Sequence, residues 1–246
     1  MRPGRRRDWA YAITYLYGGE MRMEKSEFRC IWLLLAGFGA AAVTVLVMCL
    51  NFRSQIPDTV GRNLTEAERT EVIGRNSPLT EYIYLSPNAD FPRGDKIRKL
   101  TIHHMAGDLL LEELGASFAQ QDRRASANYA IDSRGRVGLY VEEANQAWTS
   151  RSPKNDSQAV TIEVANDEIG GEWHVSDTAY ERLIELCADI CRRNGIEELR
   201  YTGDETGNLT IHSMFYSGTE CPGPYLTGRM EEIAAEVNRR LDEDGK

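Results

Sequence analysis

The stretch KLTIHHMAGD, residues 99–108, places two of the four histidines of this chain side by side. Its first six residues are short, apolar and β-branched, which predicts a buried strand. Because successive side chains of a strand point to opposite faces, His103 and His104 cannot serve the same site. The stretch therefore predicts a sheet in which one of these histidines faces a functional site and the other has a structural role.

Strands and helices alternate on both sides of this stretch. Apolar residues at helical spacing predict a helix over 108–121, with Asp108 as its N-cap. The segments 126–132 and 136–141 flank Ser133-Arg-Gly135 and predict a hairpin, and 159–167 reads as a second buried strand.

The clearest helix is expected within 175–196, capped by Ser176 or Asp177 and ended by Gly195. Its buried stripe is expected to contain Leu183, Leu186, Cys187 and Ile190. A closing helix is expected over 223–243. This order predicts an α/β fold with a mixed central β-sheet flanked by helices on both faces.

The charge is distributed unevenly along the 246 residues. Residues 1–56 hold eight Lys/Arg and four Asp/Glu, whereas residues 57–246 hold 21 and 34, a net charge of −13. A nucleic-acid partner would require clustered cations, so the acidic main domain argues against one.

The longest apolar run, residues 30–52, contains no charged residue. Its length suits one transmembrane helix, and the basic residues of segment 1–29 place that segment in the cytoplasm. The chain is thus expected to be a single-pass membrane protein with a signal-anchor, a linker over 53–77, and a domain over 78–246 on the outer, cell-wall side. The alternative is a cleaved signal peptide and a secreted domain.

Three residues distant in the chain have the chemistry of metal ligands. His212 and Cys221 stand nine apart, and either His103 or His104 could join them. Imidazole nitrogen and thiolate sulfur are good zinc ligands, and three protein ligands leave a fourth position for water. Singly, each residue has a plainer explanation: a histidine satisfied in the core, or a small cysteine in the turn set by Pro222-Gly223.

Glu163 stands among Val160, Ile162 and Val164 in a predicted buried strand. A carboxylate is costly to bury unless it is paired or has a chemical task. Glu163 is therefore a candidate acid–base residue. The alternative is that it lies on the solvent-exposed face of an edge strand.

Five motifs in order resemble those of a known family: KLTIHHMAG (99–107), ASANYAIDSRGRV (125–137), AWTS (147–150), NDSQAVTIEVAND (155–167) and HSMFYSGTECPGPYL (212–226). Their order and spacing are similar to those of zinc-dependent N-acetylmuramoyl-L-alanine amidases, the domain shared by phage lysozyme-type amidases and peptidoglycan recognition proteins. The resemblance runs from about Ser77 to Leu241. It implies one Zn²⁺ per chain, with His103, His212 and Cys221 as its ligands, and Glu163 as the acidic residue beside the metal.

The resemblance also implies an activity: hydrolysis of the amide bond between N-acetylmuramic acid and L-alanine by zinc-activated water, with Glu163 as general base. Peptidoglycan is then the substrate, with Asn128 or Thr219 donating to the oxyanion and Tyr129 and Trp148 lining the groove. For Tyr129 a place in the core is an equal alternative. Two rival functions are a non-catalytic peptidoglycan-binding module and a zinc peptidase acting on the stem peptide.

Several positions depart from the family pattern. Some members have a catalytic Tyr where this chain has Ala127, and some have a Lys where it has Thr219. Many have His at the positions of Asn128 and Thr149. The missing Lys leaves fewer groups to stabilise the oxyanion.

Overall fold

The computed structural model describes residues 56–244. The expected cytoplasmic segment 1–29 and the expected membrane anchor 30–52 lie outside the described residues. In the part of the chain that the structure describes, no helix combines the length and the hydropathy needed to cross a bilayer.

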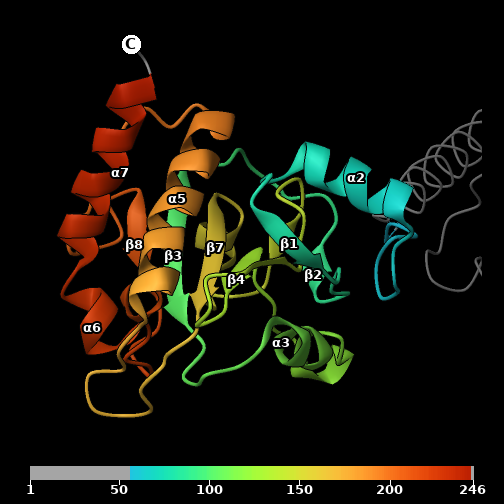
Figure 1. The fold of residues 1–246 in the computed structure, drawn as a ribbon, viewed down its shortest axis with the longest axis horizontal. Coiled ribbons are helices and arrows are strands. Elements are labelled where there is room, and N and C mark those ends of the chain that lie inside the picture. Colours follow the sequence, from blue (N-terminus) through green and yellow to red (C-terminus); the bar gives the residue numbers. More distant parts are fainter. Residues whose placement is uncertain (1–55, 245–246) are drawn as a thin grey trace, which may run out of the picture. The chain divides into compact units, whose positions relative to one another are not determined.

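The predicted mixed sheet is confirmed (Figure 1). Its six strands lie in the order β1 (Thr80–Ile83), β5 (Val137–Leu139), β4 (Tyr129–Ile131), β7 (Ala159–Val164), β3 (Lys99–His104) and β8 (Leu209–Ile211). Neighbouring strands are parallel except for β4 and β5, which form the expected antiparallel hairpin. A separate antiparallel pair joins β2 (Ala89–Asp90) to β6 (Gln146–Ala147).

One face of the sheet is apolar and carries the main core. In-register residues of the three strands β3, β7 and β8 supply it: Leu100, Ile102, Val160, Ile162, Leu209 and Ile211. Helices α5 (Asp177–Asn194) and α7 (Met230–Asp244) contribute their buried residues to the same core. Burying one such aliphatic side chain stabilises the fold by about 1.5–3 kcal/mol, so this face anchors the central strands.

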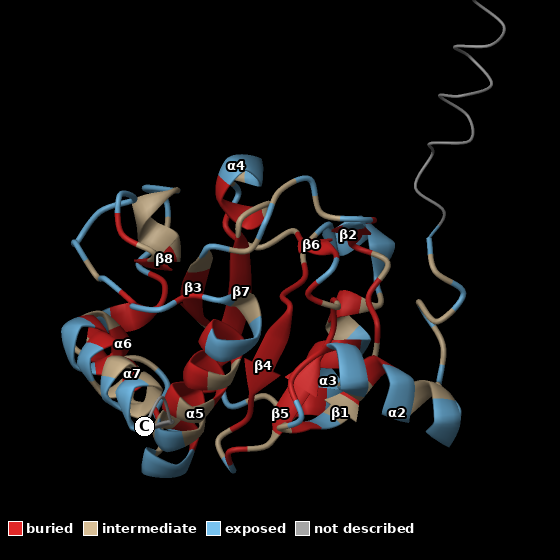
Figure 2. Cartoon of the chain, turned by 90° about the horizontal axis from the view of Figure 1, so that it is seen from above, coloured by how far each residue is buried: buried red, intermediate tan, exposed pale blue. Residues whose placement is uncertain are grey.

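The opposite face is polar along the same strands, because the alternate positions hold Thr101, His103, Thr161, Glu163 and Thr210. Helix α3 (Leu111–Phe118) packs on this face against the β4–β5 hairpin, and the short helix α4 (Pro153–Asp156) lies against β7. Helices therefore flank both faces, as expected. In Figure 2 the central strands are buried and the exposed residues lie on the outer sides of the helices.

Helix α5 follows its sequence signals closely. Ser176 is the N-cap, with its hydroxyl accepting the Ala179 N–H at 3.2 Å, and Gly195 ends the helix in the left-handed conformation at φ +66°. The expected stripe of Leu183, Leu186, Cys187 and Ile190 is buried. Helical periodicity was sufficient to predict α5 and its buried residues, because one face of this helix packs along its length on the sheet.

Two expected helices differ from the structure. The first begins at Leu111 rather than after Asp108, because the Glu113 carboxylate reaches back to accept the N–H of Leu110 at 2.9 Å. The closing helix is two helices, α6 (Gly223–Thr227) and α7, with Gly228 between them.

Part of the stretch expected as a linker contributes to the core. Helix α2 (Glu66–Arg75) begins at a capping box, in which Thr65 and Glu68 satisfy each other's backbone N–H groups. Val72 of this helix is buried in the main core, and Val60 and Leu64 pack against the same cluster. From at least Val60 onward, the chain is therefore attached to the domain by apolar contacts.

Candidate metal centre

Strand pairing brings two of the candidate residues together. His103 of β3 is in register with Glu163 of β7, and in-register residues of parallel strands point to the same face. His212 follows β8, the other neighbour of β3, and begins the 3₁₀ helix η3 (His212–Met214). All three residues therefore reach the carboxyl ends of adjacent strands on the polar face.

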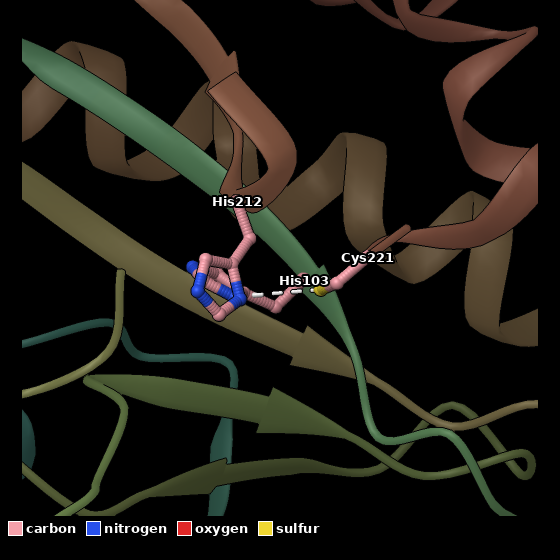
Figure 3. A group of neighbouring side chains, drawn as sticks. All are labelled: His103, His212 and Cys221. Atoms are coloured by element: carbon pink, nitrogen blue, oxygen red, sulfur yellow. Dashed lines mark hydrogen bonds between the residues drawn. The ribbon is translucent and has the colours of Figure 1, made fainter. Parts of the chain in front are cut away.

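His103, His212 and Cys221 converge at this edge (Figure 3). One potential ligand atom from each lies within 4.8 Å of the other two, and Cys221 Sγ is 3.6 Å from His103 Nδ1. The centres of the His103 and His212 imidazole rings are 4.8 Å apart. Bond lengths of about 2.0–2.3 Å to zinc place neighbouring ligand atoms roughly 3.5 Å apart, so the donors are arranged closely enough for one ion.

The bonding state of these side chains also fits a metal site. The Nε2 atoms of His103 and His212 are buried and have no hydrogen-bond partner among the described residues. Burial holds the pKa of His103 well below its ordinary value, with His212 as a smaller cause. Burial and then the charge of Arg151 lower the pKa of His212. Both rings are therefore neutral near pH 7, which is the form that binds metal.

Backbone groups hold Cys221 in place. The His104 N–H donates to Cys221 Sγ at 3.4 Å, and the Cys221 N–H donates to Thr219 Oγ1 at 3.2 Å. Gly223 has φ +83°, and a Cβ there would lie 3.0 Å from Trp173 Cβ. Burial raises the pKa of the Cys221 thiol and the charge of Glu163 adds to the rise, so a bound cation is what would favour the thiolate.

Glu163 occupies an unusual position for a carboxylate. The residue is partly exposed, yet its Oε2 atom is buried and has no partner in the described part of the chain. Burial raises the pKa of Glu163 to about 8, and the charge of Arg123 opposes this rise. A carboxyl group with such a pKa can exchange a proton near neutral pH.

Two of the other candidate residues, His104 and Tyr129, do not face the metal centre. His104 lies on the opposite side of β3 from His103, and its ring packs edge-on against Trp173 at 5.2 Å. Tyr129 is fully buried, and its hydroxyl donates to Glu143 Oε1 at 2.6 Å. Tyr129 therefore belongs to the core, the alternative named above, and does not line a groove.

Asn128 is also fully buried and does not face substrate. Its amide donates to the Val141 carbonyl at 3.0 Å, and its Oδ1 accepts the Thr161 N–H at 3.1 Å. These bonds tie the segment before β4 to the segment after β5 and to β7. The prediction that Asn128 binds an oxyanion is therefore wrong, because its amide is used inside the fold. Trp148 and Thr219 are partly exposed and remain accessible.

Two arginines near the site were not expected from the sequence. Arg123 affects the pKa of Glu163, and Arg151 affects that of His212, which places both within electrostatic range of the centre. The guanidinium carbon of Arg151 lies 4.3 Å from the centre of the Tyr216 ring. No local pattern distinguishes these arginines from the other exposed ones, so only the fold could identify them.

Residues 93–224 match the model of a family described as N-acetylmuramoyl-L-alanine amidase. A search of curated proteins gave no match.

Several solved structures are similar. PlyL is 17% identical, with 68% of this chain and 91% of PlyL covered at a TM-score of 0.46. The catalytic domain of XlyA is 15% identical, with 63% and 97% covered at 0.48. The N-acetylmuramoyl-L-alanine amidase LysC from Clostridium intestinale URNW is 19% identical, with 65% and 99% covered at 0.46.

Proposed function

This chain belongs to the N-acetylmuramoyl-L-alanine amidase family, and on that premise we propose that it cuts peptidoglycan with a zinc ion and Glu163 as general base. The bond is the amide that joins the lactyl group of N-acetylmuramic acid to L-alanine. The observation that carries the proposal is the convergence of His103, His212 and Cys221 beside Glu163.

His103, His212 and Cys221 would hold the ion. Two imidazole nitrogens and one thiolate form a donor set typical of catalytic zinc, which keeps one coordination position for water or substrate. Zinc bound there supplies Lewis acidity, which activates water and polarises the scissile carbonyl. The approach of Cys221 Sγ to His103 Nδ1 at 3.6 Å supports this assignment, because it leaves one ring nitrogen and the sulfur facing the same point.

Glu163 accepts a proton from the attacking water and later delivers it to the leaving amine. Without a metal, burial raises the pKa of Glu163 to about 8, and a cation beside it would lower that pKa and favour the carboxylate form that can accept a proton. Its register with His103, on the same face of the sheet, supports this role.

Thr219 is the remaining side chain proposed to stabilise the oxyanion. Its hydroxyl oxygen accepts the Cys221 N–H, which leaves the hydroxyl proton free to donate. This arrangement offers a donor beside the third ligand, at the position where some family members have Lys.

Purified cell walls provide the direct test. We expect the protein to release peptides with newly exposed L-alanine amino groups, and Glu163→Gln to retain zinc and fold while losing at least about 100-fold in rate, because the general base is gone. Glu197→Gln, which alters an exposed carboxylate after α5, is the matched control and should keep full activity.

The products also separate the rival functions. A binding module would adsorb to the walls and release nothing, and a peptidase would give fragments cut within the stem peptide. Full activity of Glu163→Gln would show that another group is the base.

A further inference from the structure

The loop over residues 167–174 is closed at its base. It lies between β7, the strand that carries Glu163, and α5. The Asp167 N–H donates to the His174 carbonyl at 3.1 Å, and His174 Nδ1 lies 2.6 Å from Asp167 Oδ1. The two ends of this segment, called the 167–174 loop below, are therefore fixed to each other.

Trp173 of this loop has an unusual backbone conformation. Its φ is +56°, in the left-handed region that a bulky side chain rarely adopts. Its N–H donates to the Gly170 carbonyl at 2.9 Å, and its own carbonyl accepts the side-chain amide of the buried Asn166 at 2.7 Å. Such a conformation persists only when the surroundings impose it, and such residues gather at functional sites.

The side chain of Trp173 packs against two neighbours of the candidate metal centre. Its ring meets the His104 ring edge-on, with 5.2 Å between the ring centres. A Cβ on Gly223 would lie 3.0 Å from Trp173 Cβ and 3.3 Å from the nearest atom of the His104 ring. The backbone at Gly223 therefore fits closely against both side chains.

These contacts act on the turn that begins at Cys221. The sulfur of Cys221 accepts the backbone N–H of His104 at 3.4 Å. Further along the same turn, the Glu172 carbonyl accepts the Tyr225 N–H at 3.0 Å. Cys221 is thus held by a backbone bond from β3 on one side and by the 167–174 loop on the other.

We propose that Trp173 is a positioning residue that holds Cys221 in the geometry required for metal binding. Its indole is only a hydrogen-bond donor and cannot bind the ion, so it acts through the His104 ring and the turn at Gly223. This inference rests on the proposed function, which assigns Cys221 as a zinc ligand. Residues that orient a ligand from outside the coordination shell change metal affinity by about 10–100-fold when they are replaced.

The metal affinity of Trp173→Ala tests the proposal. Competition with a chelator should give a zinc dissociation constant at least about tenfold above that of the wild type. With cobalt in place of zinc, the thiolate-to-metal charge-transfer band should weaken, because the sulfur is no longer held at the ion. Trp173→Phe keeps an aromatic ring against His104 and should recover most of the affinity.

Tyr201→Ala is the matched control for general destabilisation. Tyr201 is a half-buried aromatic residue that packs against the main core, in the segment before β8. This variant should lower Tm but keep the zinc dissociation constant within about twofold, because distant sites act independently. An equal loss of affinity in Tyr201→Ala, or wild-type affinity in Trp173→Ala, would overturn the proposal.

A measurement on the metal-free protein separates this proposal from the proposed function. Cys221 is buried in the wild type, so alkylation of its thiol, located by mass spectrometry, requires local opening. The reaction should be about tenfold faster in Trp173→Ala, because the turn opens more often. If the wild type binds no zinc, the proposed function fails, and the alkylation rates still decide the role of Trp173. Equal rates would show that Trp173 does not hold Cys221.

Discussion

Three buried polar atoms at the candidate centre have no hydrogen-bond partner in the described part of the chain: His103 Nε2, His212 Nε2 and Glu163 Oε2. Each such group costs about 1–3 kcal/mol when left unsatisfied. The folded chain supports this cost because the polar side chains stand on strands fixed from the other face by the apolar core. At the same place Cys221 Sγ and His103 Nδ1 lie 3.6 Å apart, so a cation there could be bound by both.

Replacing one ligand tests this interpretation at the residue scale. Cys221→Ser should lower the zinc content well below one per chain and abolish hydrolysis, because a hydroxyl is a much weaker zinc ligand than a thiolate. Zinc can be measured by atomic absorption on protein shown by circular dichroism to be folded. Cys191→Ala, which removes a buried thiol from α5, should leave the zinc content unchanged, and an unchanged content in Cys221→Ser would rule out the cysteine as a ligand.

At the scale of elements, helix α5 connects the core to the site-bearing sheet. The hydroxyl of its N-cap, Ser176, accepts the Ala179 N–H and also donates to the Ser133 carbonyl at 2.6 Å. One side chain thus caps the helix and fixes the β4–β5 hairpin turn to it. The apolar stripe of α5 then covers the face opposite to His103 and Glu163.

Removing this cap has a predictable cost. Ser176→Ala should lower the free energy of unfolding by about 1–2 kcal/mol, because both the capping bond and the bond to the turn are lost. Urea denaturation of Ser217→Ala provides the control, since Ser217 is exposed and no described residue hydrogen-bonds to its hydroxyl. A loss below about 0.5 kcal/mol in Ser176→Ala would show that water replaces the cap without cost.

At the scale of the whole molecule, the candidate metal centre joins segments that are distant in the chain. His103 is the next-to-last residue of β3, His212 follows β8, and Cys221 lies in the loop before α6. An ion that binds only the folded arrangement stabilises it by mass action, by about 4 kcal/mol when free zinc exceeds the dissociation constant a thousandfold. Zinc would therefore contribute to stability as well as to chemistry.

Chelation should make this contribution visible. Removing zinc from the wild type is expected to lower Tm by roughly 8–16 °C, from about 4 kcal/mol and a shift of 2–4 °C per kcal/mol for a domain of this size. Differential scanning calorimetry with and without chelator measures the change, and adding zinc back should reverse it. Cys221→Ser should show almost no shift, and an equal Tm for zinc-loaded and chelated wild type would mean that the three residues do not bind zinc in the folded state.

Local sequence determined much of this protein. The β3 strand has the limits that its apolar pattern predicts, α5 has the expected cap and stripe, and the alternation of side chains separated His103 from His104. The family resemblance of five motifs predicted His103, His212 and Cys221 as metal ligands and Glu163 as the base; the first three converge in the fold, and the roles stay predictions. The expected membrane anchor over 30–52 stays a prediction from hydropathy.

Only the tertiary structure decided which polar side chains face the site. Asn128 and Tyr129 carry polar groups that could serve a substrate, but Val141, Thr161 and Glu143 occupy those groups inside the fold. Arg151, by contrast, gains its position from Asp156 and Tyr216. The physical reason is that periodicity and capping depend on neighbours within a few residues, whereas burial and hydrogen-bond partners depend on segments brought together from distant parts of the chain.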